Sequence, residues 1–233
     1  MHLSKTGTRK RAANMHDEGL GGPQILPEAR RLYGLAAAQG NADAQFNLGT
    51  MHDEGQGGTQ DLPEARRLFG LAAAQGHADA QFHLGVMYDE GRGGPQDLPE
   101  ARRLYGLAAA QGNAGAQCNL GIMHADGQGG RKDLPEARRL FGLAAAQGDA
   151  CAQFNLGSMH DDGEGGPQDL QEARRLCGLA AAQGNANAQF HLGLMHADGQ
   201  GGPQDLLEAR RLYGLAAAQG HTGAQCNLGN MHS

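Results

Sequence analysis

The chain repeats one pattern of residues every 36 positions. The string Ala-Gln-Phe-Asn-Leu-Gly at residues 44–49 recurs with small changes from residues 80, 116, 152, 188 and 224. A fixed period of roughly 20–50 residues predicts a solenoid, in which each unit packs against its two neighbours. No insertion interrupts the copies, so we expect every pair of neighbours to stack in the same manner.

Each unit predicts two helices. The first helix of a unit is expected to begin after Asp61, which provides an N-cap acceptor, with Pro63 in its first turn. Apolar residues then follow at i, i+3, i+4 and i+7, and Gly76 suits the position after the last turn. A second helix is expected from residue 77 to Gly91. We call this second type, which carries the Ala-Gln-Phe string, helix A, and the first type, which carries Glu-Ala-Arg-Arg, helix B. Two residues join helix B to the next helix A, so the two must be antiparallel.

These patterns define the predicted domain organisation. Helix B is expected to begin at about residues 25, 61, 97, 133, 169 and 205, which gives about six units. We predict that residues 14–233 form a single all-α solenoid and that residues 1–13 form a weakly ordered basic tail.

The composition agrees with helices and argues against several other classes of protein. Gly accounts for 39 of the 233 residues, Trp is absent, and Val and Ile occur only as Val86, Ile25 and Ile122, too few for a sheet. A net charge of −6 gives no electrostatic reason to expect a nucleic-acid partner. The sequence shows neither an apolar run of the roughly 18 residues that span a bilayer nor the apolar segment of a secretory signal, so we expect a cytoplasmic protein.

The repeated unit resembles a known family. Its pattern is A-x-A-Q-x-x-L-G-x-M-[HY]-x-x-G-x-G followed by D-x-x-x-A-x-x-L-[FY]-x-x-A-A-x-Q-G, which is similar to the Sel-1-like repeat (SLR), a relative of the tetratricopeptide repeat. The resemblance covers roughly residues 14–232. It implies a right-handed superhelix of 36-residue antiparallel helix pairs with helix A on the concave surface, and a role as an adaptor in protein complexes. The family usually has Tyr after the Met of helix A, which is retained here only at Tyr88.

Differences between the copies locate a candidate binding surface. In helix A the positions of Ala44, Gln45, Leu48, Gly49, Met51 and His52 hardly vary, so that arc is the predicted packed face. Most of the other positions vary, and we predict that those equivalent to 43, 47, 50 and 54 line a groove for a protein or peptide partner. The alternative is that these positions vary because nothing contacts them. The predicted groove consists of Asp43, Asn47, Thr50, Glu54, Asp79, His83, Val86, Glu90, Asn119, Ile122, Asp126, Asn155, Ser158, Asp162, Asn187, His191, Leu194 and Asp198.

Other repeated residues are interpreted as structural. Gly49 and Gly70 with their equivalents lie inside helices, where we predict that they permit close helix approach. The Arg pairs, such as Arg30 and Arg31, are predicted to form a solvated face with i, i+3 pairing to Glu.

The sequence predicts no metal site and no cofactor. Equivalent histidines, such as His52, lie one repeat apart, roughly 10 Å, which is too far to share a zinc ion. The cysteines have no CxxC or other metal spacing, so we expect free thiols that act as small apolar substitutes for the residues of other copies, which are Phe or Tyr at three of the positions and include Asp43 at the fourth. The four cysteines are Cys118, Cys151, Cys177 and Cys226.

Three functional interpretations remain. The first is a non-catalytic scaffold that binds a protein or peptide through helix A, because every polar residue of interest recurs in several copies whereas an active site needs one asymmetric place. The second is a hydrolase of the β-lactamase type associated with cysteine-rich relatives, although the paired cysteine of each of their repeats is missing here. The third is a fragment of a longer array, because the chain ends within a helix A at Ser233. Such a fragment would associate end to end.

Overall fold

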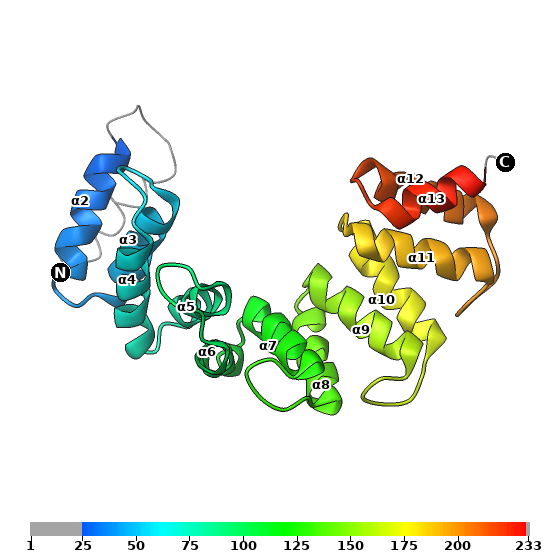
Figure 1. The fold of residues 1–233 in the computed structure, drawn as a ribbon, viewed down its shortest axis with the longest axis horizontal. Helices are drawn as coiled ribbons and strands as arrows, with labels where there is room; N and C mark the ends of the chain where they lie inside the picture. Colours follow the sequence, from blue (N-terminus) through cyan, green and yellow to red (C-terminus); the bar gives the residue numbers. More distant parts are fainter. Residues whose placement is uncertain (1–24, 232–233) are drawn as a thin grey trace, which may run out of the picture. The chain divides into compact units, whose positions relative to one another are not determined.

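The computed structural model describes residues 25–231, and the regular secondary structure of this range is α-helical throughout (Figure 1). The two helix types alternate as predicted. The helices of type B are α2 (Ile25–Ala37), α4 (Leu62–Ala74), α6 (Leu98–Ala110), α8 (Leu134–Ala146), α10 (Leu170–Ala182) and α12 (Leu206–Ala218). The helices of type A are α3 (Ala42–Glu54), α5 (Ala78–Glu90), α7 (Ala114–Asp126), α9 (Ala150–Asp162), α11 (Ala186–Asp198) and α13 (Thr222–Asn230). The all-α solenoid prediction is confirmed for this range, whereas the predicted basic tail at residues 1–13 lies outside it.

The predicted caps begin and end the helices. Asp61 Oδ1 accepts a hydrogen bond from the backbone N–H of Glu64 at 3.1 Å, and Pro63 follows in the first turn of α4. His77 is the N-cap of α5, and its Nδ1 accepts a hydrogen bond from the N–H of Ala80 at 3.2 Å. It ends at Gly91, whose φ of 68° lies in the left-handed region that glycine adopts without strain.

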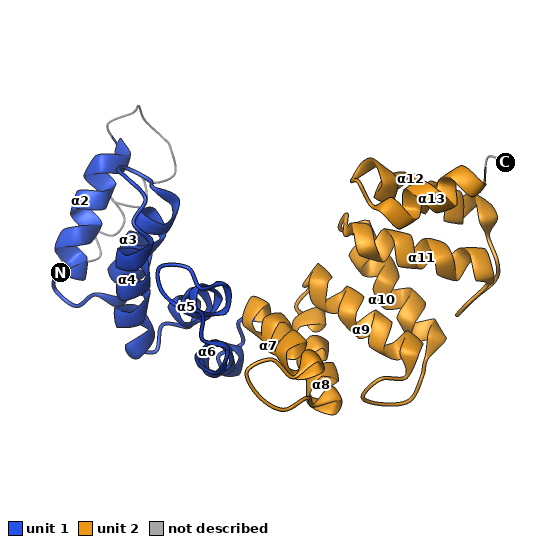
Figure 2. Ribbon diagram, viewed as in Figure 1, with its two compact units in different colours: residues 1–113 blue, residues 114–233 orange. Residues whose placement is uncertain are grey.

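The chain divides into two compact units, residues 1–113 and residues 114–233 (Figure 2). Within unit 1, α2 to α6 pack in chain order, each helix against the next, and the same holds for α7 to α13 within unit 2. The continuity of one solenoid over residues 14–233 stays a prediction.

The invariant arc of helix A is the packed face. Ala44, Gln45, Leu48, Gly49 and Met51 are all buried in α3, and their equivalents are buried in α5, α7, α9 and α11. A buried aromatic residue of the following helix B completes the core of most units, such as Phe69 in α4 and Tyr105 in α6. Comparison of the copies therefore predicted this face correctly except at His52, which is half-buried.

The glycines of helix A permit close approach, as predicted. A Cβ atom on Gly85 would lie 2.8 Å from Cδ1 and Cε1 of the Tyr105 ring, and Gly49 stands in the same relation to Phe69. The prediction was wrong for the glycines of helix B, because a Cβ atom on Gly70 or Gly106 would meet nothing within 4 Å. The added Cβ atom would therefore lie in open space beside helix B.

A buried glutamine in helix A connects three helices. Gln81, which is only 4% exposed, donates from Nε2 to the carbonyl of Ala73 at the end of α4, at 3.2 Å. Its Oε1 accepts from Nε2 of Gln111, which caps the end of α6, at 2.7 Å. Gln45, Gln153 and Gln189 make the same two bonds in their own repeats. Both polar ends of a buried amide are thus satisfied only when the two flanking helices B are in place.

The two arginines of each pair have different roles. Arg31 forms the predicted pair with Glu28, with Nη2 and Oε1 2.7 Å apart on an exposed face. The prediction of a solvated role was wrong for the first arginine. Arg30 reaches across 22 residues to Nδ1 of His52 at 2.8 Å and donates to the carbonyl of Thr59 at 3.2 Å. It therefore binds the glycine-rich link between α3 and α4.

Contact with arginine favours the neutral form of these histidines. Burial lowers the pKa of His52, the charge of Arg30 lowers it further, and two nearby carboxylates raise it by less. The pKa values of His160 and His196 are lowered by the same causes, with Arg138 and Arg174 as the cations. Since the guanidinium can only donate, the nitrogen that faces it must be unprotonated.

The histidine contacts predict a loss of stability in mild acid. A histidine with a lower pKa in the folded state binds protons more weakly there than in the unfolded chain. The stability from these residues is therefore complete above about pH 6.5 and is lost as the pH falls through the folded pKa.

Replacement of His52, His160 and His196 by Tyr should weaken this dependence on pH. Tyr88 occupies the same position naturally, and Cζ of Arg66 lies 3.8 Å from its ring centroid. Thermal denaturation at about pH 7.5 and about pH 5.5 would measure both effects. An equal fall in Tm between the two pH values for the unaltered chain and the Tyr variant would contradict the assignment.

The two classes of glycine predict opposite effects of the same substitution. Gly85→Ala should destabilise the chain by about 1–3 kcal/mol, because the added methyl group overlaps the Tyr105 ring. Gly106→Ala should stabilise it by about 0.5–1 kcal/mol, because it fills open space and favours the helix. Urea denaturation followed by circular dichroism would compare the two variants, and shifts of the same sign would refute the distinction.

Candidate functional site

The predicted groove residues all lie on the less buried side of helix A, and none of them is buried. They nevertheless differ in how many contacts they make within the chain. The side chains at positions equivalent to 43 bind the next repeat: Oδ1 of Asp43 lies 3.4 Å from Nε2 of His77, and Oδ1 of Asp79 accepts from Nδ2 of Asn113 at 3.0 Å. These carboxylates therefore help to hold neighbouring repeats together.

The two histidines of the predicted groove also pack within the chain. The ring of His83 stacks on Phe69 with centroids 5.4 Å apart, and burial lowers its pKa. Nε2 of His191 lies 3.2 Å from Oδ2 of Asp161, and Nδ1 lies 3.4 Å from Sγ of Cys177. Position 47 and its equivalents thus combine a half-exposed edge with structural contacts.

In the helices A from α3 to α11, position 54 and its equivalents are exposed, whereas position 50 and its equivalents are half-buried. Val86, Ile122 and Leu194 are half-buried apolar side chains on this surface. An exposed carboxylate follows four residues later in every repeat from α3 to α11. These acidic residues are Glu54, Glu90, Asp126, Asp162 and Asp198.

One varying position is not open. Phe46 stacks on His77 with centroids 4.9 Å apart and contacts Phe69, while Cys118 at the equivalent position is only 2% exposed. The varying arc therefore includes a side chain that packs against the next repeat.

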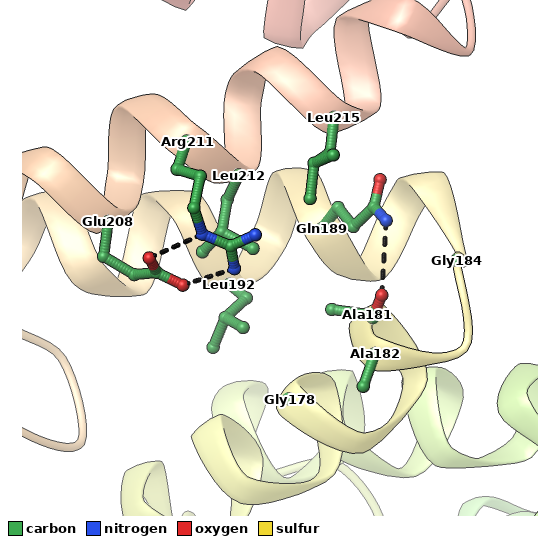
Figure 3. A pocket seen from close by; sticks show the side chains of 10 residues that line it. All are labelled: Gly178, Ala181, Ala182, Gly184, Gln189, Leu192, Glu208, Arg211, Leu212 and Leu215. Atoms are coloured by element: carbon green, nitrogen blue, oxygen red, sulfur yellow. Dashed lines mark hydrogen bonds and ion pairs between the residues drawn. The ribbon is translucent and has the colours of Figure 1, made fainter.

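A second concave feature, which sequence reasoning missed, recurs beside helix B. In unit 2 a pocket of about 350 Å³ lies between α10, α11 and α12 (Figure 3). Gly178 and the buried Gln189 line it, together with Leu215 and the Glu208–Arg211 ion pair. Equivalent pockets occur at residues 70–107 and 142–179. One sequence signal could have predicted these pockets. Leu71 and its equivalents are invariant although they lie outside the apolar stripe of helix B, and Leu71 is 41% exposed.

Three potential metal ligands converge in unit 2. Sγ of Cys118 in α7, a carboxylate oxygen of Asp149 and Sγ of Cys151 in α9 all lie within 4.8 Å of one another. The two thiols are hydrogen-bonded, which lowers the pKa of Cys151 to about 7 and, together with burial, raises that of Cys118. Sequence spacing did not suggest this cluster, because its members belong to different repeats.

All four cysteines are free. Cys118 and Cys177 are buried and replace aromatic residues of the core, as predicted. Cys151 and Cys226 are exposed, so the interpretation as apolar core substitutes was wrong for them.

A family model with the description Sel1 repeat matches residues 10–41, 42–77, 78–113, 114–149, 152–185 and 186–221. The chain belongs to the Sel1 repeat family. This confirms the resemblance to SLR proteins, and the five matches that begin within residues 25–231 start at or near the first residue of a helix A rather than a helix B.

Solved structures of Sel1 repeat proteins share the fold. A protective antigen of uropathogenic Escherichia coli strains with an SLR fold is 34% identical, with a TM-score of 0.88 over 97% of this chain and 48% of the antigen. The chain thus spans about half the length of that antigen. A Sel1 repeat protein from Oxalobacter formigenes is 28% identical, with a TM-score of 0.87 over 97% of this chain and 88% of the other. An immunity protein from Pseudomonas aeruginosa is similar in fold alone. It is 18% identical, with a TM-score of 0.51 over 95% of this chain and 85% of the other.

No curated protein matches the sequence. Among the helices of residues 25–231, none has the length and apolar character needed to cross a bilayer.

Proposed function

We propose that this Sel1 repeat protein is a non-catalytic scaffold that binds an extended protein segment along the helix A surface. The observation that carries the proposal is the repetition of accessible side chains at positions 50 and 54. Within unit 1, Val86 is accompanied by Glu54 and Glu90; within unit 2, Ile122 and Leu194 are accompanied by exposed aspartates. A surface that repeats with the helices suits a partner that is itself extended.

The chemistry of this surface indicates the kind of partner. Half-exposed apolar side chains offer area that a partner can remove from water. The exposed aspartates beside Ile122 and Leu194 favour basic residues and penalise acidic ones, whereas Glu90 beside Val86 already lies 3.8 Å from Nη1 of Arg92. The preferred partner is therefore a segment in which apolar and basic residues alternate, and we place this interaction in the cytoplasm.

The absence of catalysis is part of the proposal. Its support is that the exposed carboxylates at position 54 and its equivalents recur from repeat to repeat, whereas a catalytic site needs several different groups in one place. No observation favours the β-lactamase-type alternative.

Removal of the apolar side chains should weaken partner binding. The test uses peptides that the unaltered chain selects from a random displayed library. They should bind the variant with Val86→Ser, Ile122→Ser and Leu194→Ser at least about 10-fold more weakly than they bind the unaltered chain, because each substitution removes apolar area that binding would bury. Fluorescence anisotropy would measure the dissociation constants, and the selected peptides should be rich in Lys and Arg.

A matched variant tests the choice of surface. Leu107→Ser, Leu179→Ser and Leu215→Ser remove the same kind of side chain from the pockets beside helix B, and this variant should bind the peptides as the unaltered chain does. Loss of binding in the pocket variant with retention in the helix A variant would refute the proposed surface.

The non-catalytic assignment has its own test. We expect the purified chain to hydrolyse a chromogenic β-lactam no faster than buffer does. Turnover that rises in proportion to protein concentration and disappears on heat denaturation would contradict the assignment.

A further inference from the structure

The cluster of Cys118, Asp149 and Cys151 breaks the symmetry of the repeats. The equivalent residues two repeats earlier are Phe46, His77 and Asp79, of which the first two form a stacked aromatic pair. At the junction of α7 and α9 that pair is replaced by a thiol and a carboxylate, and a second thiol stands beside them. In residues 25–231 this is the one place where three potential metal ligands converge.

Each of the three side chains is already held where a ligand would be needed. Oδ1 of Asp149 accepts from the N–H of Ala152 at 2.7 Å, which fixes the carboxylate at the N-cap of α9. Nδ2 of Asn155 donates to Sγ of Cys151 at 3.3 Å. Cys118 is buried beneath them and approaches from α7.

The N-terminal end of α9 favours negative charge at Cys151, whereas the charge of Asp149 acts to raise the pKa of both thiols. Cys151 lies in the first turn of α9, where the unpaired backbone N–H groups and the helix dipole favour negative charge. Two thiolates and a carboxylate would carry three negative charges, of which a divalent cation neutralises two.

We infer that Cys118, Cys151 and Asp149 bind a zinc ion, with a water molecule as the fourth ligand. Zinc takes sulfur and carboxylate ligands at about 2.0–2.3 Å in tetrahedral geometry, which places ligand atoms roughly 3.3–3.8 Å apart. The present separations of at most 4.8 Å therefore need to close by no more than about 1.5 Å. Cys151 is exposed and can supply this movement by rotation of its side chain.

This site would link two successive repeats. The ion would join α7 to α9, two helices A of successive repeats, within unit 2. Because it binds only the folded arrangement, zinc should raise the Tm of the chain.

Cobalt(II) provides the direct probe. The full chain, reduced with a phosphine, should bind one equivalent of Co²⁺ with thiolate-to-metal charge-transfer bands and the visible bands of tetrahedral cobalt, and Zn²⁺ should displace it. Cys151→Ser should abolish the charge-transfer bands and weaken zinc binding by more than about 100-fold, since even residues beyond the ligands contribute 10–100-fold. Asp149→Asn keeps an N-cap acceptor, so it should fold normally and still weaken binding. Absence of these bands in the unaltered chain, or equal binding by either variant, would overturn the inference.

Cys226 provides an internal control. It is exposed like Cys151 but lies outside the cluster, so Cys226→Ser should bind cobalt as the unaltered chain does. Zinc should slow the alkylation of Cys151 by iodoacetamide and leave the alkylation of Cys226 unchanged. Peptide mass spectrometry would follow both reactions. Equal protection of both cysteines, or of neither, would refute a site at the cluster.

Discussion

The buried glutamine of helix A is the interaction on which the stacking depends. Its amide group binds the end of the preceding helix B and, through a second glutamine, the end of the following one, as Gln81 does with Ala73 and Gln111. Without the following helix B the amide loses its second partner and is exposed, as Gln225 is in α13. The smallest group of helices with complete hydrogen bonding is therefore B–A–B rather than one antiparallel pair. Stability in each unit must come largely from the contact between repeats.

The sequence predicted most of what depends on residues close together in the chain. Helix ends followed from Asp61 and Gly91, and the buried face of helix A followed from the positions that stay constant between copies. Contacts between repeats were harder to predict, because the period gives the spacing of units but not the offset at which their side chains meet. For this reason the pairing of Arg30 with His52 was missed, and the open space around Gly106 was mistaken for a helix contact.

The candidate sites illustrate the same limit. Variation between copies located the accessible side chains at positions 50 and 54, but it did not separate them from Phe46 or His83, which also vary and yet pack on neighbouring repeats. The cluster at Cys118 depends on single-residue differences in two successive repeats, and only their stacking brings the atoms together. Departures from the repeat are more informative about function than the repeat itself, provided that the stacking is known.

The open glycines of helix B have a consequence for how such arrays can diversify. Gly70, Gly106, Gly142 and Gly178 each lie beside empty space, so a larger side chain could be introduced there without any movement of the backbone. Each pocket beside helix B could then change its shape independently of the others and at little cost to folding. The array thus carries a row of sites at which new recognition properties could evolve one substitution at a time, while the glutamine and helix A glycine positions keep the stack intact.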